Sequence, residues 1–151
     1  MTTHTPIRTG QGLAYGLLGL PLAFVALPLY VLLPNHYARE FGMPLATLGS
    51  VLLAARLFDA VSDPLLGRLS DHLFGRSVRA VLAVGAVSAV VLALGLTSLF
   101  FPWVRGTDAL IAWALVALLI TYTAYSQLGI AHQSWGARLG GDELQRGRIV
   151  A

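Results

Sequence analysis

The chain has 151 residues, of which 56% are hydrophobic and only 11% are charged. A soluble globular domain carries roughly 25% charged residues, so this composition excludes a protein that is surrounded mainly by water. The ten basic residues, all of them Arg, give a net charge of +3 but lie scattered between apolar blocks, not in the clustered patch that nucleic-acid binding needs. The absence of Cys excludes disulfides, zinc–thiolate sites and thiol catalysis.

Four apolar blocks are long enough to cross a bilayer, which takes about 20 mostly apolar residues. In chain order they span residues 13–33, 45–69, 78–101 and 108–131. Short breaks with turn-forming residues separate them, namely Pro34-Asn35-His36, Gly75-Arg76 and residues 102–106. The first block is too long for the core of a signal peptide. The sequence therefore predicts an all-α membrane protein, with residues 1–151 forming one transmembrane region of four helices.

The Arg residues predict the orientation of these helices. With the N-terminus inside, only Arg39 and Arg105 lie outside, and Arg56 lies within a span. The other seven lie on the cytoplasmic side: Arg8, Arg68, Arg76, Arg79, Arg138, Arg146 and Arg148. Short cytoplasmic loops carry an excess of basic residues, so we expect a multi-pass protein of the cell inner (plasma) membrane with both termini cytoplasmic. Pro21 and Pro28 should bend the first helix.

The second block carries three charged residues, Arg56, Asp59 and Asp63, at spacings of three and four. These spacings place all three on one helix face. A charge at the centre of a bilayer costs roughly 2.5–3.5 kcal/mol, so this face should meet a wet cavity or other polar helices. Two interpretations remain open. The charges could form an ion-pair network that locks helices together, or the two carboxylates could bind Na⁺ or share a proton.

The fourth block places Tyr122, Ser126, Gly129 and Gln133 on one face, at steps of four, three and four. Aromatic and hydroxyl groups on a shared face suit sugar recognition, and they suit hydrogen bonds between helices equally well. We expect His36 and His72 in loops and His132 near a helix end. None of these histidines has partners at the spacing of a metal site, so no metal centre is expected beyond Na⁺ at the two carboxylates.

These residues together resemble the glycoside-pentoside-hexuronide:cation symporters, the melibiose-carrier branch of the major facilitator superfamily. The second block matches the family pattern R-x-x-D-x-x-x-D-P-x-x-G-x-x-x-D at Arg56, Asp59, Asp63, Pro64, Gly67 and Asp71. Residues 67–76 also resemble a cytoplasmic loop motif of the superfamily, carried by Gly67, Asp71 and Arg76, although His72 replaces a basic residue and one residue is added. The resemblance continues at Tyr122, Thr123, Trp135, Gly136, Ala137, Asp142, Arg146 and Arg148.

The resemblance implies a twelve-helix fold, of which these four helices would be the N-terminal part, with the remaining helices absent from this chain. It implies that Asp59 and Asp63 bind the coupling cation, Na⁺ or H⁺, and that Thr123 contributes to that site. We expect Arg56, Tyr122 and Ser126 to bind the substrate or to act in gating. The implied function is cation-coupled symport of a sugar, a glycoside or a related small solute, with no enzyme activity and no cofactor.

Two departures from the family pattern bear on the substrate. The melibiose carriers have a sugar-binding Asp in the first helix, where this chain has only apolar residues and Gly. They also have an Asp where Ser126 stands, and a Trp where Ile130 stands. Cation binding is thus supported better than galactoside binding. The alternative from another class is a small membrane scaffold or assembly protein with the charged face as a lock between helices. An intramembrane enzyme has no nucleophile–base pair to support it.

Overall fold

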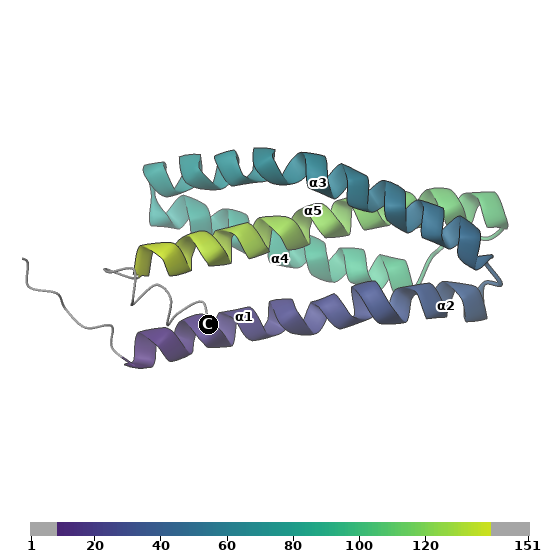
Figure 1. The fold of residues 1–151 in the computed structure, drawn as a ribbon, viewed down its shortest axis with the longest axis horizontal. Helices are drawn as coiled ribbons and strands as arrows, with labels where there is room; N and C mark the ends of the chain where they lie inside the picture. Colours follow the sequence, from purple (N-terminus) through teal and green to yellow (C-terminus); the bar gives the residue numbers. More distant parts are fainter. Residues whose placement is uncertain (1–8, 140–151) are drawn as a thin grey trace, which may run out of the picture.

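The computed structural model describes residues 9–139, and it leaves out the side chains of residues 9–14, 18 and 137–139. The described chain is a bundle of long helices lying side by side, in which the start of the first and the end of the last lie at the same end (Figure 1). The elements are α1 (Thr9–Leu27), the π-helix η1 (Pro28–Leu32), α2 (Leu33–Glu40), α3 (Leu45–Arg76), α4 (Val78–Phe100) and α5 (Thr107–Leu139). Four stretches are long and apolar enough to cross a membrane, namely Tyr15–Glu40, Leu45–Arg76, Val78–Phe100 and Thr107–Gly136. The predicted all-α membrane architecture is therefore confirmed.

The first span runs without a break through Pro34, the proline at which we expected it to end. α1, η1 and α2 follow one another directly, and the chain leaves the helix only after Glu40. Proline has no N–H to donate within a helix, and the backbone widens locally, so that the N–H of Leu33 donates to the carbonyl of Pro28. α2 follows this five-residue bond, and Pro34 is its second residue, in the first turn where a proline is tolerated. The prediction of a break at Pro34-Asn35-His36 was wrong, and His36 lies in a helix.

The second and fourth spans continue beyond their apolar blocks. α3 reaches Arg76 and α5 reaches Leu139, although the apolar residues end near 69 and 131. Hydrophobicity marks only the part of a helix inside the bilayer, and hydrogen bonding continues the helix until a residue stops it. For α3 that residue is Ser77, which is extended and whose Oγ accepts the N–H of Ala80, 3.1 Å away. The expected loop at residues 67–76, including His72, is therefore helical.

The two connections at the opposite end both turn at a glycine with positive φ. Gly42 has φ of +63° and Gly106 has φ of +92°, a region that favours glycine because other residues carry a Cβ. Beside them, His36 Nε2 lies 2.9 Å from the carbonyl of Phe100. Trp113 donates from Nε1 to the carbonyl of Ser98 at 2.8 Å. These bonds satisfy carbonyls at the end of α4, which its own helix leaves without partners.

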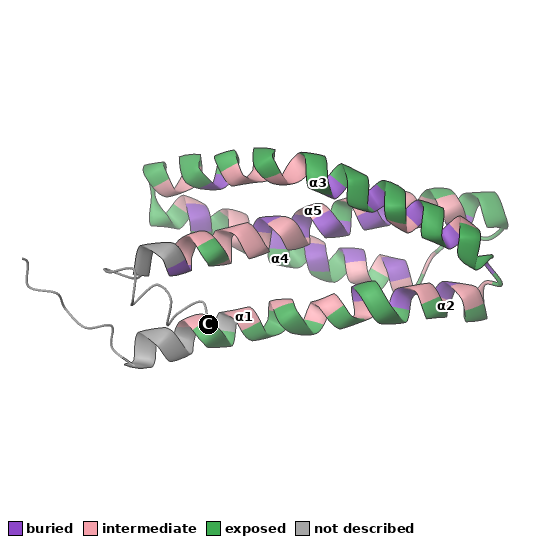
Figure 2. Ribbon diagram, in the orientation of Figure 1, coloured by how far each residue is buried: buried purple, intermediate pink, exposed green. Residues whose placement is uncertain are grey.

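α5 is the helix around which the others pack, and its buried face contacts both α3 and α4. α4 approaches α5 closely at Gly95, because an added Cβ there would collide with the Thr121 side chain. Helices in lipid associate mainly through such close packing of small residues. The outward faces of α1, α3 and α4 remain largely exposed (Figure 2). This packing turns the central part of α3 toward α5, where the charged residues lie.

Candidate functional site

The charged face of α3 meets α5 halfway along the bundle. Asp59 is buried, at 6% exposed, and Asp63 is partly buried one turn further along. The remaining residues of α3 that are buried in the bundle are Leu48, Val51, Ala55 and Ser70. A step of four residues keeps side chains on one face, so Asp59 and Asp63 continue the packed face of the helix. The structure thus turns both predicted cation ligands toward the inside of the bundle.

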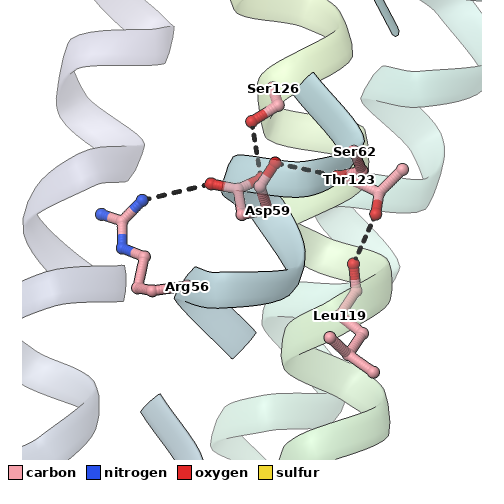
Figure 3. Close-up of polar contacts among 6 residues, drawn as sticks. All are labelled: Arg56, Asp59, Ser62, Leu119, Thr123 and Ser126. Atoms are coloured by element: carbon pink, nitrogen blue, oxygen red, sulfur yellow. Dashed lines mark hydrogen bonds and ion pairs between the residues drawn. The ribbon is translucent and has the colours of Figure 1, made fainter. Parts of the chain in front are cut away.

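Both carboxylate oxygens of Asp59 have a partner (Figure 3). Arg56 Nη1 lies 3.2 Å from Oδ2, and the Ser126 hydroxyl donates to Oδ1 at 2.9 Å. The first contact is within α3, whereas the second joins α3 to α5 across 67 residues of sequence. Hydrogen bonds to a charged acceptor are stronger than neutral ones, so this pair of contacts fixes the Asp59 carboxylate. Three of the residues singled out from the sequence therefore form one cluster.

The guanidinium of Arg56 also lies over two aromatic rings. Its Cζ is 4.2 Å from the ring centre of Tyr30 and 4.9 Å from that of Tyr122. Both distances lie within the range of about 6 Å at which a cation is attracted to a ring face. Together with Leu29, Leu52 and Leu53, these three side chains line a cavity of about 300 Å³. The predicted substrate-side residues Arg56, Tyr122 and Ser126 are thus brought together around Asp59.

Asp63 differs from Asp59 in having a buried oxygen without a partner. Its Oδ1 makes no hydrogen bond, although the atom is inaccessible to solvent within the described part of the chain. Buried polar atoms almost always have a partner, and an exception calls for an explanation such as an ion. A carboxylate oxygen is the ligand that Na⁺ and similar hard cations prefer. The unpartnered Oδ1 of Asp63 is therefore an oxygen that a small cation could bind.

Thr123 lies on an adjacent face of α5. Its hydroxyl donates to the carbonyl of Leu119 at 2.7 Å, and its side chain lines a second cavity, of about 330 Å³, with Phe58 and Ser88. A hydroxyl that donates its hydrogen keeps two lone pairs for a cation. In the structure, however, this hydroxyl faces the cavity between α3, α4 and α5. The structure thus brings Asp59, Arg56, Tyr122 and Ser126 together and leaves Thr123 beside them.

Sequence reasoning missed two polar residues of this region. Tyr30 forms one wall of the cavity at Arg56, and Gln127 is buried, with its Oε1 unpartnered, one turn beyond Thr123 on α5. An amide inside an apolar block is a signal in itself, because an unpaired polar group is costly in lipid. Tyr30 offered a weaker signal, since tyrosine is common near the ends of spans.

The other predicted residues lie apart from the cluster. Gly67, Asp71 and Arg76 follow one another along the last turns of α3, with Asp71 and Arg76 exposed. Within residues 9–139, no group of three or more His, Cys, Asp or Glu residues could hold a metal ion.

Comparison with known proteins identifies the class. The sequence model of the family described as MFS/sugar transport protein matches residues 12–151. Because this match covers nearly the whole chain, the chain belongs to that family of membrane transport proteins, which are not enzymes.

One relative is similar to part of the chain. A protein of Escherichia coli (strain K12) that carries the provisional name glycoside/cation symporter YagG is 34% identical to this chain over 68 residues. The matched stretch makes up 45% of this chain and 15% of the relative, so the chain spans only a small part of that protein's length. No solved structure matches the chain.

Proposed function

We propose that the chain forms the cation-coupling part of a symporter for a sugar, a glycoside or a related small solute. Asp59 and Asp63 are the cation ligands in this proposal, and Thr123 adds a hydroxyl oxygen when the cation is bound. The observation that carries the proposal is the buried, unpartnered Oδ1 of Asp63, one helical turn from Asp59 within a membrane span. A cation between the two carboxylates would satisfy that oxygen. The coupling ion is Na⁺ or H⁺, and no other cofactor is needed.

The solute site in this proposal is the cavity of about 300 Å³ beside Arg56 and Tyr122. A tyrosine ring offers a flat apolar face for a sugar ring, and Ser126, which does not line this cavity itself, offers a neutral hydrogen-bonding group beside Asp59. Ser126 already contacts Asp59 at 2.9 Å. A solute that engages Ser126 would therefore act on the same carboxylate as the cation, which is the physical requirement for coupling.

The protein would work in the cell inner (plasma) membrane with both termini cytoplasmic. The aligned part of the relative is only 15% of its length, and the outward faces of the helices described here are largely apolar and exposed. We infer that further helices of the full gene product cover part of these faces and complete the solute site.

Transport measurements on the full gene product test this proposal. Asp59→Asn and Asp63→Asn keep the shape of each side chain and remove its charge. Removing one partner of a buried charge pair costs about 2 kcal/mol or more, which corresponds to more than tenfold in affinity. Each variant should lose cation-stimulated uptake of a glycoside while reaching the membrane normally. Asp108→Asn, an exposed acid in the first turn of α5, is the matched control and should keep it.

The scaffold function is the second candidate, and the pairing of both Asp59 oxygens favours it. A lock between helices needs its charges paired for stability and has no need of a cation. In that case, Asp59→Asn would lower the amount of folded protein, and no cation would stimulate uptake in any variant. Retained cation stimulation in both aspartate variants would likewise rule out the proposed coupling site.

A further inference from the structure

Arg56 occupies one of the two carboxylate oxygens of Asp59. Its Nη1 makes a single contact of 3.2 Å with Oδ2. The side chain of Arg56 is 45% exposed, whereas that of Asp59 is 9% exposed. A single contact is weaker than the bidentate pair that an arginine and a carboxylate can form. A small cation could therefore displace the guanidinium from the carboxylate at modest cost.

Arg56 is held by two aromatic rings as well as by Asp59. The faces of Tyr30 and Tyr122 lie 4.2 Å and 4.9 Å from its Cζ, and the cavity of about 300 Å³ opens beside them. An arginine that leaves Asp59 would remain attracted to these rings. The guanidinium would thus move by a small distance and would not be left as an unpaired charge in the membrane.

We propose that Arg56 is a built-in competitor of the coupling cation. It neutralises Asp59 while no cation is bound, and when a cation bridges Asp59 and Asp63 it withdraws from Asp59 and keeps only its contacts with the rings of Tyr30 and Tyr122. This inference rests on the proposed cation site and adds to it a residue that sets the affinity of that site. This competition would also limit the charge of the empty site. With Arg56 paired to Asp59, only Asp63 carries an uncompensated charge. The empty site is then less costly in the bilayer, so the cation can leave again.

Cation titrations of the purified full gene product test directly whether Arg56 competes with the cation. Isothermal titration calorimetry with NaCl, at constant ionic strength set by choline chloride, gives the dissociation constant of Na⁺. If Na⁺ gives no heat, proton binding is measured instead, by pH titration of the same samples. Arg56→Gln should tighten cation binding by about 3- to 30-fold, the range that ion-pair strengths between exposed and buried sites correspond to.

Tyr30→Leu should change the cation affinity in the opposite direction to Arg56→Gln. Without that ring, an Arg56 displaced from Asp59 keeps fewer contacts, so its displacement costs more and cation binding should weaken by about 2- to 5-fold, as expected for one cation–π contact. In the double variant with Arg56→Gln, the Tyr30 substitution should have no further effect. Arg39→Gln removes an equal charge at an exposed position of α2 and should leave the dissociation constant unchanged.

Failure of this inference is distinguishable from failure of the proposed function. If Asp63→Asn abolishes cation binding but Arg56→Gln leaves it unchanged or weakens it, the cation site stands and the competitor is refuted. If Asp63→Asn binds the cation as the unaltered protein does, the proposed site is wrong as well. If Arg56→Gln does not reach the membrane, Tyr30→Leu tests the proposal by itself. Unchanged or tighter cation binding in Tyr30→Leu would refute the proposal that Arg56 competes with the cation.

Discussion

The close approach of α4 and α5 at Gly95 makes a sharp prediction about stability. A Cβ added at Gly95 would collide with Oγ1 of Thr121 and would lie 3.2 Å from its Cβ and 3.5 Å from its Cα. Thr121 cannot easily turn aside, because it is fully buried and its hydroxyl donates to the carbonyl of Ala117 at 2.6 Å. Gly95→Ala therefore forces the two helices apart.

The size of the effect follows from two opposing terms. Overpacking a well-packed interior costs about 1–3 kcal/mol, and replacing glycine by alanine within a helix recovers about 0.5–1 kcal/mol. We expect a net loss of about 1–2 kcal/mol in the free energy of unfolding. Thr121→Ala removes the colliding hydroxyl. In that background, Gly95→Ala should lower the free energy of unfolding by less than about 1 kcal/mol, because substitutions at residues in contact are not additive.

Unfolding of the full gene product in mixed micelles with increasing sodium dodecyl sulfate, followed by circular dichroism, measures these differences. Gly85→Ala is the matched control, because Gly85 lies on the same helix and an added Cβ there meets nothing within 4 Å. The control should be neutral or slightly stabilised. If Gly95→Ala behaves like Gly85→Ala, α4 and α5 are further apart than the structure has them.

Two further predictions concern topology and the solute side of the site. Reporter fusions after Gly42 and after Ser77 should report the outside and the inside of the cell respectively, and the reverse pattern would refute the orientation inferred from Arg. Ser126→Asp in the full gene product should strengthen Na⁺ stimulation or shift solute preference toward galactosides, because it adds a carboxylate within hydrogen-bonding range of the Asp59 position. Unchanged uptake and cation dependence would place Ser126 outside the working site.

Hydrophobicity and helical spacing predicted the four spans, and they also predicted that the three charges of α3 share a face. They did not predict where the helices end, because hydrogen bonding continues α3 through polar residues to Arg76. The predicted break at Pro34 in the first span was wrong for a related reason. A proline breaks the four-residue hydrogen-bond pattern, but the chain switched to a five-residue bond from Leu33 to Pro28 and stayed helical.

The partners of the charges could not be read from the sequence. Ser126 meets Asp59 only because α3 and α5 pack at one particular rotation, and the periodicity of either helix alone leaves that rotation open. Tyr30 lies within the π-helix, where an extra residue in the turn changes which face a side chain presents. A residue turns by about 100° around a regular helix. A regular helical wheel therefore misassigns residues within and beyond the wider turn, so it could not have placed Tyr30 beside Arg56.

The lock and the cation site need not exclude each other, since the two carboxylates are held differently. Asp59 has both oxygens bonded, one of them to another helix, so it contributes to packing in the absence of a cation. Asp63 leaves an oxygen buried and unbonded, and a charge held so within a bilayer costs roughly 2.5–3.5 kcal/mol unless a cation or proton joins it. A purely structural lock would gain from an apolar residue at position 63. The presence of a carboxylate there is what cation coupling would require.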